Sequence, residues 1–248
     1  MPTGVAHLRP AFVDAGQLEK KRPMEFSEDW FSSNIPIWLT LLEEFRGRPR
    51  LRALEIGVFE GRSTCWLLEN ILTGEGSTID CIDTFAGIEH GYRAVDMDAV
   101  RRRFEANTTP WDERVTLHVG KSARVLAKLA GPYDIIYIDG SPTAANVLVD
   151  AVLAWRLTRD NGIIIFSDYG WPKYSDQPWL RPHLAIDAVL QCFIGWYQCL
   201  NFGCQIAIRK LAAYQPLPPA SIVASSATLD IYQPCAPFAA RFSWEDTG

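Results

Sequence analysis

Short apolar runs alternate with segments of helical periodicity between about residues 50 and 211. Five of these runs have the length of strands: RALEIG (52–57), TIDCID (78–83), VTLHVG (115–120), YDIIYID (133–139) and GIIIFSD (162–168). Helical patterns lie between them, near 62–72, 94–106, 122–130 and 144–159. Nearly continuous apolar strands separated by helices are typical of a parallel sheet that is covered on both faces. The sequence therefore predicts an α/β fold with helices on both sides of the sheet.

The pattern changes near the end of this region. A further helix is expected over 183–194. The segments WYQCL and CQIAIRK follow, joined across NFG, and they predict an antiparallel hairpin at the edge of the sheet.

Two helices carry apolar residues at a spacing that predicts their buried faces. In FSEDWFSSNIPIWLTLLEEF, the stripe comprises Ile37, Leu41, Glu44 and Phe45, with Trp38 and Leu42 beside it. In NVLVDAVLAWRL, the predicted stripe comprises Leu148, Val152 and Trp155, and Asn161-Gly162 is the expected C-terminal stop of that helix.

The length of 248 residues allows one sizeable core but not two large domains. We expect an N-terminal arm and helix over 1–49, the sheet-bearing domain over 50–211, and a proline- and alanine-rich tail over 212–248. The net charge of −5 gives no global reason to expect nucleic-acid binding, and the basic run at 101–104 reads as a solvated helix face.

Composition also excludes several other kinds of protein. No apolar run approaches the roughly 20 residues of a membrane span, and the N-terminus lacks the pattern of a signal peptide. The six cysteines are scattered without a CxxC pair, so a zinc site is not expected. These features favour a cytoplasmic protein with reduced thiols, and they leave its oligomeric state open.

The stretch LEIGVFEGRS at 54–63 predicts a strand that enters a helix through a glycine loop. It lacks the G-x-G-x-x-G spacing of dinucleotide-binding loops, and Glu55 and Glu60 both flank it. A pyrophosphate at a helix N-terminus favours backbone N–H groups without nearby carboxylates. A ligand with an ammonium and a sulfonium group favours the reverse, which points to S-adenosyl-L-methionine (SAM). Gly57 and Gly61 would let the ligand lie close to the backbone.

Other polar residues follow the ends of the next strands. Asp83 ends the second strand, where an acid can accept both ribose hydroxyls. Thr84 follows it and would line the adenosine. Ser122, in the GKS segment after the third strand, would lie near the adenine.

With this ordered set, the chain resembles the class I SAM-dependent methyltransferases, and in particular the bacterial group of sugar and macrolide O-methyltransferases. The resemblance covers roughly residues 25–211 through the segments EDWFSSNIPIW, LEIGVFEGRSTCWLLENIL, IDCIDTFAG, YDIIYIDGS, VLAWRLTRDNGIIIFSDYGW and the hairpin ending in AIRKL. It implies a Rossmann-like seven-stranded sheet of order 3-2-1-4-5-7-6 with strand 7 antiparallel. It also implies that Glu55, Gly57, Gly61, Ser63 and Asp83 contact SAM.

Methyl transfer to an alcohol needs a group that removes the proton, or a metal that lowers its pKa. Asp139 and Asp168 end strands four and five and should face the same crevice as the SAM methyl group. Many relatives carry a histidine where Pro142 stands here, so that possible base is missing. We favour Asp139 as the base and His183 second. His90 is a further alternative, whereas His118 lies in an apolar strand and is expected to be structural.

A divalent metal is a second possibility. Metal-dependent O-methyltransferases that resemble this chain place an acid at the Asp139 position and a pair of ligands after strand five. Here Ser167 precedes Asp168, so that pair is incomplete. Asp139 and Asp168 could hold Mg²⁺ only if water and substrate oxygens completed its coordination.

Two segments could enclose an acceptor. The loop 169–182 contains Tyr169, Trp171, Tyr174 and Trp179, and aromatic walls suit a sugar or an aromatic acceptor. The segment EDWFSSNIPIW at 28–38 could close over the cofactor as a lid.

The sequence thus predicts a SAM-dependent methyltransferase that acts on a small molecule, at a hydroxyl group. Two rival hypotheses remain: a catalytically inactive SAM-binding scaffold protein, and an oxidoreductase-type nucleotide enzyme on the same kind of sheet.

Overall fold

The computed structural model describes residues 23–87, 95–171 and 177–215. Most of the predicted arm and tail lies outside these residues, as do His90 and Tyr174, so the predicted division into three regions stays a prediction. Among the described helices, none is both long enough and apolar enough to cross a membrane.

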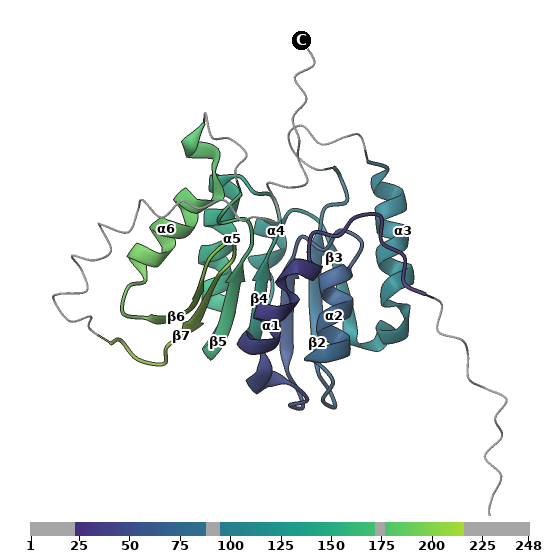
Figure 1. The fold of residues 1–248 in the computed structure, drawn as a ribbon, viewed down its shortest axis with the longest axis horizontal. Helices are drawn as coiled ribbons and strands as arrows, with labels where there is room; N and C mark the ends of the chain where they lie inside the picture. Colours follow the sequence, from purple (N-terminus) through teal and green to yellow (C-terminus); the bar gives the residue numbers. More distant parts are fainter. Residues whose placement is uncertain (1–22, 88–94, 172–176, 216–248) are drawn as a thin grey trace, which may run out of the picture.

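A seven-stranded sheet crosses the middle of the molecule, with helices on both faces (Figure 1). The strands are β1 (Arg52–Ile56), β2 (Thr78–Asp83), β3 (Val115–Val119), β4 (Tyr133–Ile138), β5 (Thr158–Phe166), β6 (Tyr197–Phe202) and β7 (Ile206–Lys210). Their order is β3-β2-β1-β4-β5-β7-β6, and β7 is antiparallel to both β5 and β6. The predicted fold class, strand order and terminal hairpin are confirmed.

The described residues also form six α-helices and four short 3₁₀ helices. The α-helices are α1 (Ile35–Leu41), α2 (Arg62–Asn70), α3 (Met97–Thr108), α4 (Ser122–Leu126), α5 (Ala144–Leu157) and α6 (Pro182–Cys192). The 3₁₀ helices are η1 (Ser32–Asn34), η2 (Glu43–Phe45), η3 (Thr109–Arg114) and η4 (Pro178–Leu180). Of these helices, η1, α1 and η2 precede β1 and the others lie between strands.

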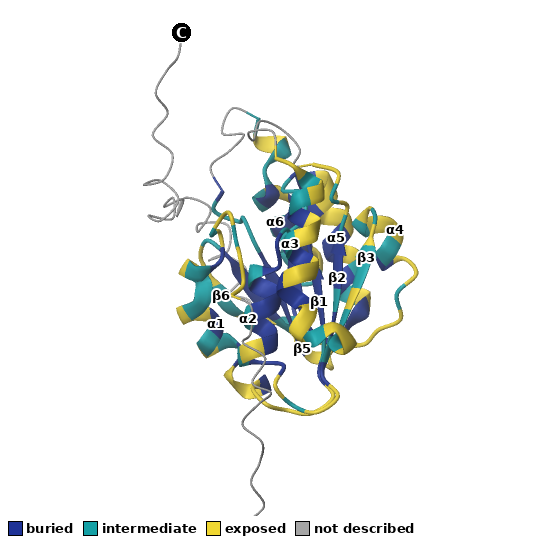
Figure 2. Ribbon diagram, turned by 90° about the vertical axis from the view of Figure 1, so that its right-hand side faces the viewer, coloured by how far each residue is buried: buried dark blue, intermediate teal, exposed yellow. Residues whose placement is uncertain are grey.

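Two apolar layers hold the helices against the sheet. Alternate residues of a strand point to opposite faces. In β4, Ile135 and Tyr137 belong to the layer shared with α1, α2 and α3, whereas Ile136 and Ile138 belong to the layer shared with α4, α5 and α6. Figure 2 shows the buried strands in dark blue between helices whose outer faces are exposed. Both faces of the central strands are therefore covered, which explains their continuous apolar sequences.

The predicted stripe on α5 is wrong in part. Leu148 and Val152 are 41% and 43% exposed, whereas Val147, Ala151 and Ala154 face the sheet and are buried. Small residues occupy the inner face because the helix lies close to the strands.

Trp155 does pack as expected. Its ring stacks on Phe193 of the segment after α6, with 4.2 Å between the ring centroids.

The predicted stripe on α1 also needs correction. Trp38 and Leu42 are fully buried, together with Phe45, while Ile37 is 41% exposed. The α-helix ends at Leu41 and a 3₁₀ turn follows. The 3.6-residue period therefore does not continue through this segment.

Asn161-Gly162 is not the stop of α5, which ends at Leu157. Both residues lie within β5, beside a shift in register with β4. Asn161 has φ of 65°, and a Cβ on Gly162 would lie 2.9 Å from the carbonyl oxygen of Arg159. The Asn-Gly pair thus has its usual turn chemistry, but it bends a strand.

A matched pair of substitutions tests the corrected face of α5. Val147→Ala should lower the free energy of unfolding by about 2 kcal/mol, because two buried methyl groups are lost. Val152→Ala, on the exposed face, should change it by less than about 0.5 kcal/mol. Urea unfolding measures both values, and equal losses in the two variants would contradict the assignment.

Candidate active site

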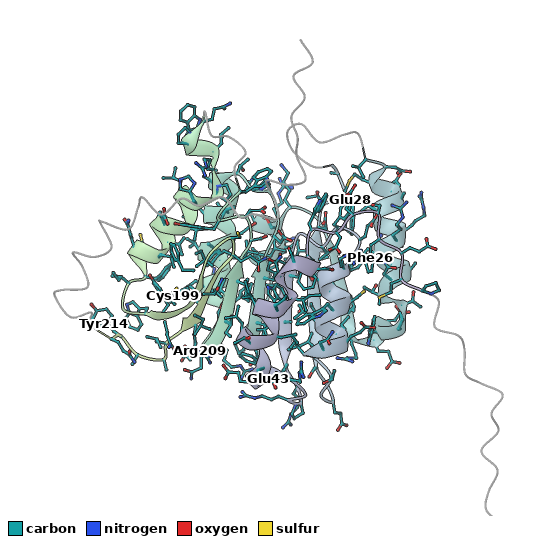
Figure 3. All side chains as sticks on the ribbon, in the orientation of Figure 1. Phe26, Glu28, Glu43, Cys199, Arg209 and Tyr214 are labelled. Atoms are coloured by element: carbon teal, nitrogen blue, oxygen red, sulfur yellow. The ribbon has the colours of Figure 1, made fainter. Side chains whose placement is uncertain are left out.

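A cavity of about 510 Å³ lies at the carboxyl ends of β1, β2, β4 and β5. Strand order reverses between β1 and β4, which is where open α/β sheets bind ligands, and the volume is typical of ligand pockets. Residues of the N-terminal segment 26–37 form another wall. Figure 3 labels Phe26 and Glu28 of this segment on the right-hand side of the molecule, above Glu43, which is near the bottom.

Most of the residues predicted from the sequence line this one cavity: Gly57, Glu60, Ser63, Asp83, Thr84, Ser122, Asp139 and Asp168. Three predicted residues are not among its lining residues. These are Glu55, Gly61 and His183.

Gly57 brings the loop after β1 against the loop after β4. Its φ is +82°, and a Cβ there would lie 2.1 Å from the carbonyl oxygen of Asp139. Backbone hydrogen bonds join the same region: Asp139 N–H donates to Ile56 and Gly57 N–H donates to Ile82, each at 2.8 Å. Glycine is therefore required here by both backbone conformation and space.

Gly61 allows α2 and α3 to pack closely. It precedes α2 with φ of +81°, and a Cβ would lie 2.9 Å from the ring of Phe104 on α3.

Among the described residues, positive φ also occurs at three residues other than glycine around the cavity. These are Phe59, Phe85 and Asp168, each in a loop that follows a strand. Such strain often gathers at functional sites.

Glu55 lies beneath the cavity. Its fully buried carboxylate accepts hydrogen bonds from the hydroxyls of Ser63 and of Thr64, the latter at 2.6 Å. Burial raises the pKa of Glu55 to about 7, and the charge of Asp83 also raises it. The hydrogen bonds from the two hydroxyls act in the opposite direction. Ser63 lines the cavity and Glu55 does not, so Ser63 connects Glu55 to the cavity.

Asp150 repeats this arrangement under Ser122. Asp150 is on α5 and is 2% exposed. Burial raises the pKa of its carboxyl to about 6, and the interaction with the Ser122 side chain lowers the pKa. The sequence analysis did not include Asp150. An acid inside the apolar run NVLVDAVLAW was the available signal.

Glu60 lines the cavity, but its charge is already paired. Its carboxylate accepts hydrogen bonds from Arg103 at 2.6 Å and from the Ser27 hydroxyl at 2.7 Å. The sequence analysis predicted that Glu55 and Glu60 both flank the glycine loop, and the structure adds how each carboxylate is held. One of them is buried below the loop, and the other is tied to α3 and to the N-terminal segment.

Asp83 holds the glycine loop in place. One carboxylate oxygen accepts from the N–H groups of Val58 and Phe59, at 3.0 and 3.1 Å, and the other accepts from Phe85 N–H at 2.9 Å. A carboxylate offers about four acceptor positions, so one remains for a ligand.

Asp139 and Asp168 form a pair of acids in the cavity. Burial, with the charge of Asp168, raises the pKa of Asp139 well above its usual range, while hydrogen bonds from Ser167 and Tyr137 act in the opposite direction. Burial raises the pKa of Asp168 to about 6. Two such acids disfavour each other's charge, so the pair suits a proton or a cation.

The donor set fits a metal only weakly. Within the described residues, no three His, Cys, Asp or Glu side chains are grouped so that they could hold an ion. Mg²⁺ is commonly held by one or two carboxylates with water and substrate oxygens, and Asp139 and Asp168 would supply the two carboxylates.

His183 does not reach the cavity lining. Its ring lies edge-on to Tyr169, 6.4 Å between centroids, and burial together with the charge of Arg181 lowers its pKa. His118 instead meets Asp80 at 2.7 Å, a contact that suits the expected structural role.

Aromatic side chains from several segments line the cavity. Among the described residues of the predicted loop, Trp171 lines it, whereas Trp179 is 64% exposed. Trp30 of the N-terminal segment and Phe59 of the loop after β1 also line it, with their rings 4.9 Å apart. The segment 28–38, predicted as a lid, therefore forms part of the wall.

Known proteins resemble this chain in sequence and in fold. Residues 54–169 match the family model described as a methyltransferase domain. The O-methyltransferase ankF of Aspergillus thermomutatus is 31% identical over 118 residues, which are 47% of this chain and 45% of that protein. The match thus spans less than half of this curated relative.

Two solved structures share the fold. An O-methyltransferase from Bacillus cereus in complex with SAH has 18% identity and a TM-score of 0.54, covering 74% of this chain and 84% of that one. The MycE methyltransferase of the mycinamycin biosynthetic pathway, in complex with Mg, SAH and mycinamycin VI, has 16% identity and a TM-score of 0.55. That match covers 77% of this chain and 53% of MycE.

Gly57→Ala should destabilise the protein by at least about 2 kcal/mol, because it adds a backbone clash to the strain of positive φ. Gly76→Ala is the matched control. Gly76 has φ of +69°, but its Cβ would meet only the Arg50 side chain, at 3.3 Å. Urea unfolding of both variants separates the effect of the backbone clash from the effect of positive φ. Equal losses of unfolding free energy in the two variants would contradict the close approach of Gly57 to Asp139.

Glu55 should make stability depend on pH. Its pKa is raised in the folded protein, so its contribution is full at low pH and is lost as pH rises from about 4.5 towards about 7. Glu55→Gln should reduce the fall in unfolding free energy between pH 5 and pH 8 by up to roughly 3 kcal/mol. Urea unfolding at the two pH values measures this, with exposed Glu69→Gln as the control. A fall as steep as in the wild type would exclude Glu55 as its source.

Proposed function

We propose, from the match of residues 54–169 to the methyltransferase-domain family model, that this protein transfers the methyl group of SAM to a hydroxyl oxygen of a small molecule. The family match agrees with the resemblance seen in the sequence. One observation carries the proposal: a single cavity is lined by the Gly57–Ser63 loop and Asp83 on one side and by Asp139 and Asp168 on the other.

The charge of the cavity supports a cationic donor. Among the described residues, the charged ones that line it are the acids Glu28, Glu60, Asp83, Asp139 and Asp168 and the bases Arg62 and Lys121. Arg62 is also engaged by Asp29, at 3.5 Å. A sulfonium donor is favoured by such a surface, and the pyrophosphate of a dinucleotide is disfavoured.

We assign the cofactor to six lining residues: Gly57, Glu60, Ser63, Asp83, Thr84 and Ser122. Gly57 gives the ligand access to the backbone, and the remaining acceptor position of Asp83 suits a ribose hydroxyl. Ser63 and Ser122, each held from below by a buried acid, present hydroxyls at fixed positions.

The reaction is an in-line displacement. The acceptor oxygen forms a bond to the methyl carbon as the carbon–sulfur bond breaks, and the sulfur keeps the electron pair in S-adenosylhomocysteine. Asp139 takes the acceptor proton, and its raised pKa makes the ionised carboxylate a stronger base than an ordinary aspartate. If Mg²⁺ is bound by Asp139 and Asp168, it lowers the pKa of the acceptor hydroxyl.

The acceptor is a small molecule because the cavity is bounded by the N-terminal segment as well as by the sheet loops. The acidic chain gives no reason to expect a nucleic-acid partner. Location in the cytoplasm and the oligomeric state remain predictions from the sequence.

Binding and turnover test the proposal separately. Calorimetry should detect binding of SAM and not of NAD, and a panel of hydroxylated acceptors with and without EDTA should reveal methyl transfer and any metal requirement. Binding of SAM without turnover across the panel would favour the inactive scaffold. Tight binding of NAD alone would overturn the assignment.

Asp139→Asn should lower kcat by at least about 100-fold, because the amide cannot take the proton. The Kd for SAM should stay within about threefold, since the cofactor is assigned to other lining residues. Exposed Asp112→Asn is the control and should behave as the wild type. An unchanged kcat in Asp139→Asn would exclude this aspartate as the base.

A further inference from the structure

Three hydrogen bonds connect the N-terminal helix to Asp139. The indole N–H of Trp38 donates to Oε1 of Gln205 at 2.8 Å, and the Gln205 amide N–H donates to the Tyr137 hydroxyl at 3.2 Å. The Tyr137 hydroxyl donates to Oδ2 of Asp139 at 2.9 Å. Trp38, Gln205 and Tyr137 are all at least 95% buried. The hydrogen-bond chain is thus continuous, and it reaches the cavity at Gln205 and Asp139, which both line it.

The indole of Trp38, the first group of this hydrogen-bond chain, determines which group donates and which accepts in each of the three bonds. An indole nitrogen can only donate, so the carbonyl end of the Gln205 amide must face Trp38. The NH₂ end then faces Tyr137, whose oxygen accepts from it. The remaining hydroxyl proton of Tyr137 points at Asp139. Each bond polarises the next in the same sense.

The chain joins parts of the fold that lie far apart in the sequence. Trp38 is on α1, Gln205 immediately precedes β7, and Tyr137 is on β4. The rings of Trp38 and Tyr137 also meet edge-on, with 4.8 Å between centroids. Asn34 and Ile37, from the same segment as Trp38, line the cavity. The segment that bounds the cavity is therefore tied to the acid inside it.

We infer that Tyr137 is a positioning residue that holds the Asp139 carboxylate towards the acceptor, and that Gln205 and Trp38 act through Tyr137 by fixing the direction of its hydroxyl. The inference rests on the proposed function for its kinetic consequence. Tyr137 and Trp38 are not among the residues that line the cavity, so their effect on the reaction must pass through other residues.

Tyr137→Phe removes the last hydroxyl of the chain. It should lower kcat by roughly 10- to 100-fold, as expected when a reacting group loses its orientation, with the KM for SAM within about twofold. Tyr133→Phe is the matched control. Tyr133 is a buried tyrosine of the same strand whose hydroxyl donates to Asp80 at 2.8 Å, away from the cavity. This control should leave kcat within about twofold. Equal losses of kcat in the two variants would overturn the inference.

A double-mutant cycle tests whether Gln205 acts through Tyr137. Gln205→Met keeps the length of the side chain and removes both hydrogen bonds, and it should lower kcat by a smaller factor than Tyr137→Phe. The double variant should be no slower than Tyr137→Phe alone, because the shared path is already broken. Independent effects that multiply would show that Gln205 acts by another route.

Crystal structures give a readout that needs no acceptor. In the wild type, the Asp139 carboxylate should hold one rotamer with Oδ2 on Tyr137, and in Tyr137→Phe it should occupy another rotamer or several. An unchanged, singly ordered Asp139 in the variant would overturn the inference. A wild-type protein without turnover would count against the proposed function alone, because this comparison would still decide the role of Tyr137.

Discussion

The site depends on the close approach between the loop after β1 and the loop after β4. Gly57 passes so near the backbone of Asp139 that no side chain fits between them, and the Asp139 N–H bonds to the last residue of β1. The residues proposed to bind the cofactor and those proposed to face the acceptor are therefore joined by backbone contacts. Methyl transfer tolerates little misplacement of the reacting atoms, so this contact is what makes the two sides one candidate reaction centre.

Acids with hydroxyl neighbours recur around this contact. Glu55 accepts hydrogen bonds from Ser63 and Thr64, Asp139 accepts one from Tyr137, and Asp150 lies buried near Ser122. Burial raises the pKa of each acid, because the charged form loses its hydration. The large two-faced apolar core offsets the cost of keeping these groups out of water. In return, the lining hydroxyls have few alternative orientations.

The N-terminal segment belongs to the site although it precedes the sheet. Its aromatic residues form part of the cavity wall, Ser27 bonds to Glu60, and Trp38 begins the chain that ends at Asp139. The terminal hairpin contributes Gln205 to the same chain. Residues from α1 and from the terminal hairpin are thus hydrogen-bonded to each other and, through Tyr137, to Asp139, the acid proposed to take the proton. These bonds connect the wall of the cavity to Asp139.

The sequence by itself determined the α/β class and brought most of the predicted site residues to one cavity, and the family resemblance implied the strand order. Apolar strand patterns are local, and the carboxyl ends of parallel strands must meet at one edge, so Gly57, Asp83, Asp139 and Asp168 could be grouped without coordinates. Only the tertiary structure decided which acids face the ligand, because burial and pairing depend on neighbours distant in the sequence. In the structure, Glu55 is buried, Glu60 is paired with Arg103, and His183 does not line the cavity. It also brought Trp38 to Gln205, 167 residues away, a contact that no local pattern contains.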